Sequence, residues 1–226
     1  MHRMQKIMAF AALVISLSLA LGSTPAWAGT APVTVKPGHR AFGMTYGQWL
    51  GTWWQHFLEL PTSANPLVGT GDRCDQVHDV LFPVFAPGYD ARCTVNPGTP
   101  VFLMLWSQEC STVEPPPYYG ADEAALRACA RTIFDDPPDV LSVTVDGRPV
   151  PNVLSYVSVS PMFHIDLPAK NLLGVGATSG EAVAAGWSVM LRPLRPGRHV
   201  IENCLQDPNA GVFNGCATLT LLVRAR

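Results

Sequence analysis

Two groups of residues have the types and spacing that acid–base chemistry needs. Gln108 and Glu109 follow the apolar run 101–106, and a glutamate partly buried at the end of a strand has a raised pKa. His164 and Asp166 are two positions apart, so on a strand they share one face and could form an oriented base or part of a metal site. The alternatives are a strand that simply ends at the surface and the solvated face of an amphipathic strand.

His199 and Glu202 form a second histidine–carboxylate group, on a segment that follows the turn at residues 195–197. Because His199 comes soon after this turn, a hydrogen bond that closes the turn is the alternative to a catalytic role. A hydrolase or lyase would need a carboxylate and a histidine in one cleft, and nothing in the sequence alone brings them together. The catalytic candidates are Glu109, His164, Asp166 and His199.

An aromatic segment carries the candidates for ligand binding. Trp53, Trp54 and His56 could stack on a sugar or another flat ligand. Large apolar residues recur at helical spacing through residues 46–60, so most of this stripe should instead face a sheet. Trp54 is the residue whose direction the helical pattern determines least, and with Trp53 it could form a ligand platform.

No motif that specifies a reaction or a cofactor is present in the sequence. It has no Gly-x-Ser-x-Gly elbow, no His-Glu-x-x-His and no phosphate-binding loop. The glycine-rich segment 174–180 lacks the lysine of such a loop, and we interpret it as a flexible connection. Cys74 and His78 have no close cysteine pair beside them, as a metal site would require. We therefore expect no cofactor and no metal.

Residues 1–28 have the three parts of a secretory signal peptide. Arg3 and Lys6 give a positive start, residues 7–21 are apolar and uncharged, and residues 26–28 (Ala-Trp-Ala) fit a signal peptidase site. The apolar run is shorter than the about 20 residues of a spanning helix, which disfavours a membrane anchor. We expect cleavage after residue 28, a single domain over residues 29–226, and a location in the periplasm or outside the cell.

All six cysteines lie after the predicted cleavage site. An even number of cysteines in an exported chain predicts disulfides rather than metal ligands. Sequence alone allows many pairings, and we favour the sequential one because each bond then closes a local loop. The expected bonds are Cys74–Cys93, Cys110–Cys129 and Cys204–Cys216.

The charge of the mature chain limits its partners. Loss of Arg3 and Lys6 leaves 13 basic and 17 acidic residues, a formal charge of −4 (13 − 17). This composition offers no basic patch for nucleic acid or anionic lipid. No later stretch is apolar enough to span a membrane. We expect the partner to be a small molecule, a glycan or an envelope protein.

The 21 prolines and 19 glycines divide the chain into short segments, which is typical of an all-β domain with many loops. Helices are predicted over residues 46–60, capped by Thr45 and Gln48 and ended by Pro61, and over residues 121–134. Strands are predicted at residues 80–85, 101–106, 141–145, 153–159, 162–167, 187–191, 199–204 and 216–223, with long loops at 63–73 and 171–186 and a hairpin turn at Asp146-Gly147. We expect a mainly β fold, a β-sandwich or jelly-roll-like domain with two peripheral helices.

Several short strings in order along the chain carry a resemblance. They are Tyr46-Gly47-Gln48-Trp49 with Trp53-Trp54, Asn65-Pro66-Leu67, Gly71-Asp72-Arg73-Cys74, Cys93-Thr94-Val95-Asn96-Pro97-Gly98, Val145-Asp146-Gly147, Ser160-Pro161-Met162-Phe163, Asn171-Leu172-Leu173-Gly174 and Pro196-Gly197-Arg198-His199. In this order the strings resemble a family of exported bacterial β-rich proteins for which no activity is established. The resemblance implies export and a β-rich fold, and it implies no chemistry.

Two functional hypotheses follow from the sequence. The first is a non-enzymatic exported domain, stabilised by disulfides, that binds a ligand or belongs to the cell envelope. The second is a secreted hydrolase or lyase, in which Glu109 converges in one cleft with His164, His199 or His56. A cleft lined by Trp54 without paired titratable groups would favour the first hypothesis.

Overall fold

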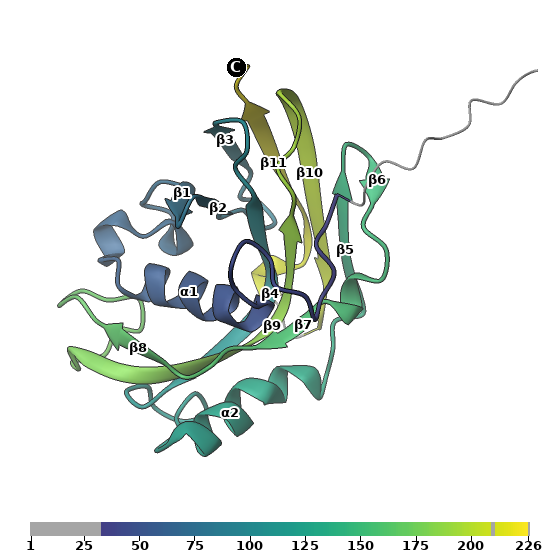
Figure 1. Ribbon diagram of the computed structural model, residues 1–226. Helices are drawn as coiled ribbons and strands as arrows, with labels where there is room; N and C mark the ends of the chain where they lie inside the picture. The colour runs from purple at the N-terminus through teal and green to yellow at the C-terminus, as the bar shows by residue number, and fades with distance from the viewer. Residues whose placement is uncertain (1–32, 209–210, 226) are drawn as a thin grey trace, which may run out of the picture. The chain divides into compact units, whose positions relative to one another are not determined.

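The computed structural model describes residues 33–208 and 211–225, which belong to one compact unit. The predicted signal peptide and its cleavage site lie outside the described residues. The fold is mainly β, with two sheets and two α-helices (Figure 1). Within the described ranges, no helix has the length and apolar character that crossing a membrane requires.

The first sheet has the strand order β1-β2-β4-β9-β7, and β8 also pairs with β9. Its strands are β1 (Cys74–Val77), β2 (Val80–Pro83), β4 (Val101–Ser111), β7 (Val157–Val159), β8 (Phe163–Asp166) and β9 (Ser179–Leu191). The second sheet has the order β3-β11-β10-β5-β6. Its strands are β3 (Ala91–Val95), β5 (Val140–Val145), β6 (Arg148–Pro149), β10 (Gly197–Gln206) and β11 (Gly215–Val223). The main hydrophobic core joins buried residues of both sheets, as in a β-sandwich.

Helix α1 (Tyr46–Leu58) packs on the inner face of the first sheet, and helix α2 (Glu123–Arg131) lies on the opposite face of β9 (Figure 1). Thr45 and Gln48 form the expected capping box at the start of α1. The first turn approaches the sheet so closely that a Cβ added to Gly47 would collide with the carbonyl oxygen of Val159. The sequence of α1 therefore fixes both where the helix begins and how near its aromatic residues come to the sheet.

The predicted hairpin at Asp146-Gly147 is confirmed. Both residues have positive φ, 52° and 73°, as a two-residue turn of the primed type requires. The turn joins β5 to the short strand β6. This element needs only local backbone chemistry, which is why the sequence predicts it correctly.

Several strand boundaries differ from the prediction. β4 continues to Ser111, and β9 begins at Ser179 inside the segment predicted as a loop. The two strands pair with each other along this added length, up to Ser111 opposite Ala182. Residues 153–155 form a short 3-10 helix rather than a strand, and β1 and β3 have no predicted counterpart. These strand boundaries depend on pairing between segments that are distant in the sequence, and local sequence patterns do not predict such pairing.

Candidate functional site

An aromatic cavity lies where α1 meets the sheets. Trp53 is 1% exposed and belongs to the core stripe of α1, whereas Trp54 is half-buried beside it. The two indole rings make an edge-to-face contact with centroids 5.3 Å apart. The Trp54 Nε1–H group donates a hydrogen bond of 3.0 Å to the hydroxyl of Ser107 on β4. Ser107 therefore fixes the plane of the Trp54 ring.

The cavity has a volume of about 580 Å³, a size typical of small-molecule sites. Its aromatic walls come from Trp53, Trp54, Phe85, Tyr89, Trp106 and Phe213. Aliphatic and proline side chains from residues 66–68 and 83–87 complete most of the lining. No Asp, Glu, Lys, Arg or His is among the described residues that line it. The site is thus apolar, with flat surfaces contributed by several segments far apart in the sequence.

Few polar side chains reach this cavity. Ser107 and Asn203 line it, and the Ser107 hydroxyl already accepts the Trp54 bond. Asn203 is 5% exposed, and its Oδ1 has no hydrogen-bond partner among the described residues. The Nε1 atom of Trp53 is likewise buried and unpartnered there. Two buried polar atoms without partners therefore belong to residues that line one cavity.

Among the residues of this site, only Trp53 and Trp54 are predicted from the sequence as ligand-binding candidates. Asn203 could have been found, because it occupies an inward position between Ile201 and Leu205 in an alternating strand. Trp106 lies in a predicted strand, but its place in the lining depends on which segments pack against that strand. His56 does not line the cavity; its Nε2 lies 2.9 Å from a carboxylate oxygen of Asp75.

Glu109 lies inside β4, opposite Ala184 of β9, and not beyond the end of the strand as predicted. Its side chain is 5% exposed, and neither carboxyl oxygen has a hydrogen-bond partner among the described residues. Burial, followed by the nearby charge of Glu114, raises the pKa of Glu109 well above 4.5. Burial therefore favours the protonated form of Glu109. Neither Glu109 nor Glu114 lines the aromatic cavity.

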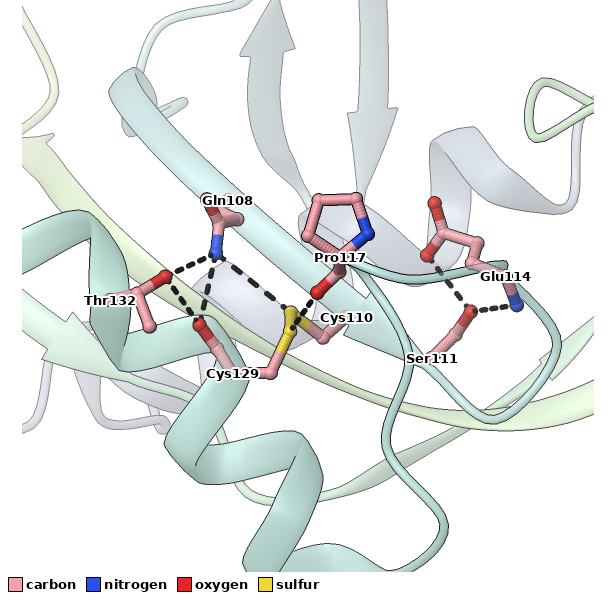
Figure 2. The surroundings of a disulfide bond; sticks show 7 residues. All are labelled: Gln108, Cys110, Ser111, Glu114, Pro117, Cys129 and Thr132. Carbon is pink, nitrogen blue, oxygen red and sulfur yellow. Dashed lines mark hydrogen bonds between the residues drawn. A yellow bond between two sulfur atoms is a disulfide. The ribbon is translucent and has the colours of Figure 1, made fainter.

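Glu114 forms the other half of this carboxyl pair. Its Oε2 accepts a bond of 2.9 Å from the Ser111 hydroxyl, and its backbone N–H donates to the same hydroxyl at 3.3 Å (Figure 2). Burial raises the pKa of Glu114, and contacts with Glu109 and Ser111 partly offset that effect. Burial raises the pKa of both carboxyls, so the pair as a whole tends to keep a proton.

Gln108 and Cys110 face the opposite side of β4, toward α2. Gln108 Nε2 donates to the Cys129 carbonyl oxygen and to the Thr132 hydroxyl, each at 3.0 Å (Figure 2). Cys110 and Cys129 form a disulfide beside these bonds. The other two disulfides join Cys74 to Cys93 and Cys204 to Cys216, so all three follow the sequential pairing. Gln108 thus helps to attach α2 to the sheet.

The His164 group lies at an exposed strand edge. His164 Nδ1 is 2.8 Å from Glu181 Oε1, and Nε2 is 3.4 Å from Asp166 Oδ1, so the predicted sharing of one face is present. The hydrogen bond with Glu181 raises the pKa of His164, desolvation opposes it, and the charges of Glu181 and Asp166 add to the rise. All three side chains are at least 40% exposed, which leaves no enclosed site around them.

His199 closes the turn before it, as the alternative interpretation expected. Its Nε2 is 2.8 Å from the Arg195 carbonyl oxygen, and its Nδ1 is 2.7 Å from Asp146 Oδ2. Burial lowers the pKa of His199, but these two hydrogen bonds raise it by more. Glu202 is exposed and takes no part in these contacts. Where the chain is described, a triple of metal-ligand atoms occurs at Glu202, Cys204 and Cys216, whose two sulfurs are bonded to each other.

The candidate catalytic residues therefore remain in separate places. His56, His164 and His199 each contact a carboxylate of their own. Within the described residues no hydrogen bond or ion pair joins any of them to Glu109. The described contacts therefore do not bring Glu109 and a histidine together, as the hydrolase hypothesis requires. The cavity lined by Trp54, which the binding hypothesis requires, is present.

Comparison with known proteins adds little to this geometry. No protein-family model and no curated protein matches the sequence. Among solved structures, the cysteine protease inhibitor EhICP2 from Entamoeba histolytica matches at 9% sequence identity, over 60% of this chain and 87% of the inhibitor chain, with a TM-score of 0.23. At that TM-score the likeness carries no argument, so the function must be inferred from the site.

Proposed function

We propose that this protein is an exported, non-enzymatic binding protein that holds an apolar small molecule in the aromatic cavity. The observation that carries the proposal is the cavity of about 580 Å³ with six aromatic residues and no charged side chain in its described lining. Burial of apolar rings in such a site is favourable at roughly 25 cal/mol per Å². The surrounding β-sandwich with three disulfides supplies a rigid frame, which lowers the entropic cost of binding.

Export is part of the same proposal. The signal-like residues 1–28 and the three disulfides both support an oxidising compartment outside the cytoplasm. The intact mass of protein recovered from the exported fraction of its host should correspond to a chain beginning at Gly29. A chain that retains residues 1–28 in that fraction would contradict cleavage.

Binding can be tested with N-phenyl-1-naphthylamine, an uncharged probe that fluoresces in apolar surroundings. We expect a saturable rise in its fluorescence on titration into the purified protein. Val68 lines the cavity and is 48% exposed, so Val68→Trp should obstruct the site without disturbing the core. The probe affinity should fall by about tenfold or more, because the added ring excludes the ligand sterically.

Val140→Trp is the matched control. Val140 is 37% exposed on β5 and does not line the cavity, so the same substitution there should leave probe affinity unchanged. Equal losses in both variants, or no saturable binding to the original protein, would overturn the proposal. Thermal unfolding of both variants checks that each remains folded.

A further inference from the structure

The ligand class can be narrowed from the polar atoms of the cavity, an inference that rests on the proposed function. Asn203 stands in a row of β10 that otherwise points apolar side chains inward, between Ile201 and Leu205. Its neighbours across the sheet are Val143 and Ala217, both buried. Packing explains an aliphatic residue at this position and does not explain an amide.

A buried amide without a hydrogen bond destabilises the folded state. Oδ1 of Asn203 has no partner among the described residues, although the side chain lines a space large enough for a ligand. A carboxyl can relieve such a cost by taking up a proton, but an amide has no comparable route. The position is therefore best explained by a ligand group that hydrogen-bonds to the Asn203 amide.

A second buried, unpartnered atom belongs to another residue of the cavity lining, on a different element. Trp53 Nε1 is on α1, whereas Asn203 is on β10 of the second sheet. The indole N–H can only donate, and the amide can donate and accept. A hydroxyl or a carbonyl on the ligand would provide a partner to one or both of these groups.

Charge excludes an ionised ligand from this cavity. A buried charge without a counter-charge or hydrogen bonds is very costly, and the described lining offers no Asp, Glu, Lys, Arg or His side chain to pair with one. Exposed basic side chains gather elsewhere: Lys36, Arg40 and Arg192 line a separate depression of about 410 Å³. The few polar groups in the aromatic cavity also match one ligand hydroxyl better than the many hydroxyls of a sugar.

We propose that the cavity takes a neutral aromatic or fused-ring compound with one hydroxyl or carbonyl group, which hydrogen-bonds to the Asn203 side chain. The rings lie among the tryptophan and phenylalanine walls, and the polar group contacts the inner face of β10. The amide at position 203 thereby selects among apolar compounds of similar size.

The test compares 2-naphthol, naphthalene and the anion 2-naphthoate by equilibrium dialysis at pH 7. We expect 2-naphthol to bind most tightly and 2-naphthoate to bind at least about tenfold more weakly than 2-naphthol. Asn203→Leu keeps the size of the side chain and removes its hydrogen-bonding groups. It should weaken 2-naphthol binding by about fivefold or more and change naphthalene binding by less than about twofold.

Retained naphthalene binding shows that the Asn203→Leu cavity is folded. Trp53→Phe, which keeps a ring and removes the N–H group, provides a second variant that should discriminate in the same direction. If each substitution changed the affinities for 2-naphthol and naphthalene equally, the proposed ligand class would be overturned. The proposed function would still stand. Failure of every neutral probe to bind the original protein would overturn both.

Discussion

The aromatic cavity and the Glu109–Glu114 pair meet the inner face of β4 only two residues apart, at Ser107 and Glu109, with Glu114 beyond the end of the strand, yet they differ in chemistry. Ser107 lines a cavity with aromatic walls, whereas Glu109 is buried and its pKa is raised by that burial and by the nearby Glu114. Each region contains buried polar atoms without hydrogen-bond partners among the described residues. Glu109 reduces the cost by retaining a proton, whereas Asn203 cannot.

The comparison shows why a perturbed pKa is not by itself a functional site. A raised carboxyl pKa is what general acid catalysis uses, but it needs a cleft that admits a substrate. Glu109 has the raised pKa without lining the cavity, and the cavity has space for a substrate but no Asp, Glu or His in its described lining. The hydrolase hypothesis required both properties in one place.

Removal of the disulfide on the α2 face should give the largest loss of stability. Cys110 and Cys129 are 19 residues apart, and the Cys110→Ala/Cys129→Ala variant should lose about 3 kcal/mol of unfolding free energy, measured by urea denaturation. Because Cys110 points away from the cavity, affinity for N-phenyl-1-naphthylamine should stay unchanged where the variant is folded. Lost probe binding in the folded variant would show that the two faces of β4 are not independent.

Glu109→Gln should change how stability depends on pH. The folded state binds the Glu109 proton more tightly than the unfolded chain, so the unfolding free energy falls as pH rises above about 4.5 toward the raised pKa. The glutamine variant should lack this fall, so at pH 8 it should be more stable than the original protein, by about 1.4 kcal/mol for each pH unit over which that fall extends below pH 8. Urea denaturation between pH 4 and pH 8 measures the effect.

Glu202→Gln is the control for this prediction, because Glu202 is exposed and its substitution should leave the pH profile intact. Probe affinity should be independent of pH between pH 4 and pH 8 in both variants, since no Asp, Glu, Lys, Arg or His is present in the described lining. If probe affinity changed with pH in the original protein but not in Glu109→Gln, the aromatic cavity and the Glu109–Glu114 pair would belong to one functional site.

The smallest change in unfolding free energy is expected at the partly exposed His199–Asp146 pair. This pair is a reference for the larger pH effect expected of the buried carboxyls. Burial raises the pKa of Asp146, but hydrogen bonds from His199 and the Val200 N–H group outweigh it and the net shift is downward. The pair contributes fully to the unfolding free energy at pH values between 3.8, the ordinary pKa of Asp146, and 6.5, the ordinary pKa of His199. This contribution is lost as pH falls through the lowered pKa of Asp146 or rises through the raised pKa of His199.

Asp146→Asn keeps a residue that tolerates the positive φ of 52° at this turn. The pKa of His199, followed by NMR, should fall toward its ordinary value. The unfolding free energy near pH 5 should drop by at most about 0.5 kcal/mol, because solvent screens a pair whose aspartate is 46% exposed. A loss as large as that from the disulfide would contradict this ranking.

Local chemistry in the sequence determined several features of the fold. The Thr45–Gln48 capping box, the Asp146-Gly147 turn and the three disulfides between neighbouring cysteines each depend on residues close together in the chain. Their energies are set by backbone conformation and short loops, so sequence spacing is enough to predict them. The aromatic stripe of α1 is predictable for the same reason.

The tertiary structure alone decided where the candidate chemistry lies. The segment 107–111 has no strand pattern of its own, and it becomes part of β4 only by pairing with the distant strand β9, which buries Glu109. The cavity brings together α1, β4, β10 and the segments at 66–68 and 83–89. Whether a tryptophan or an asparagine faces a core or a ligand depends on these long-range contacts, which local sequence patterns do not specify.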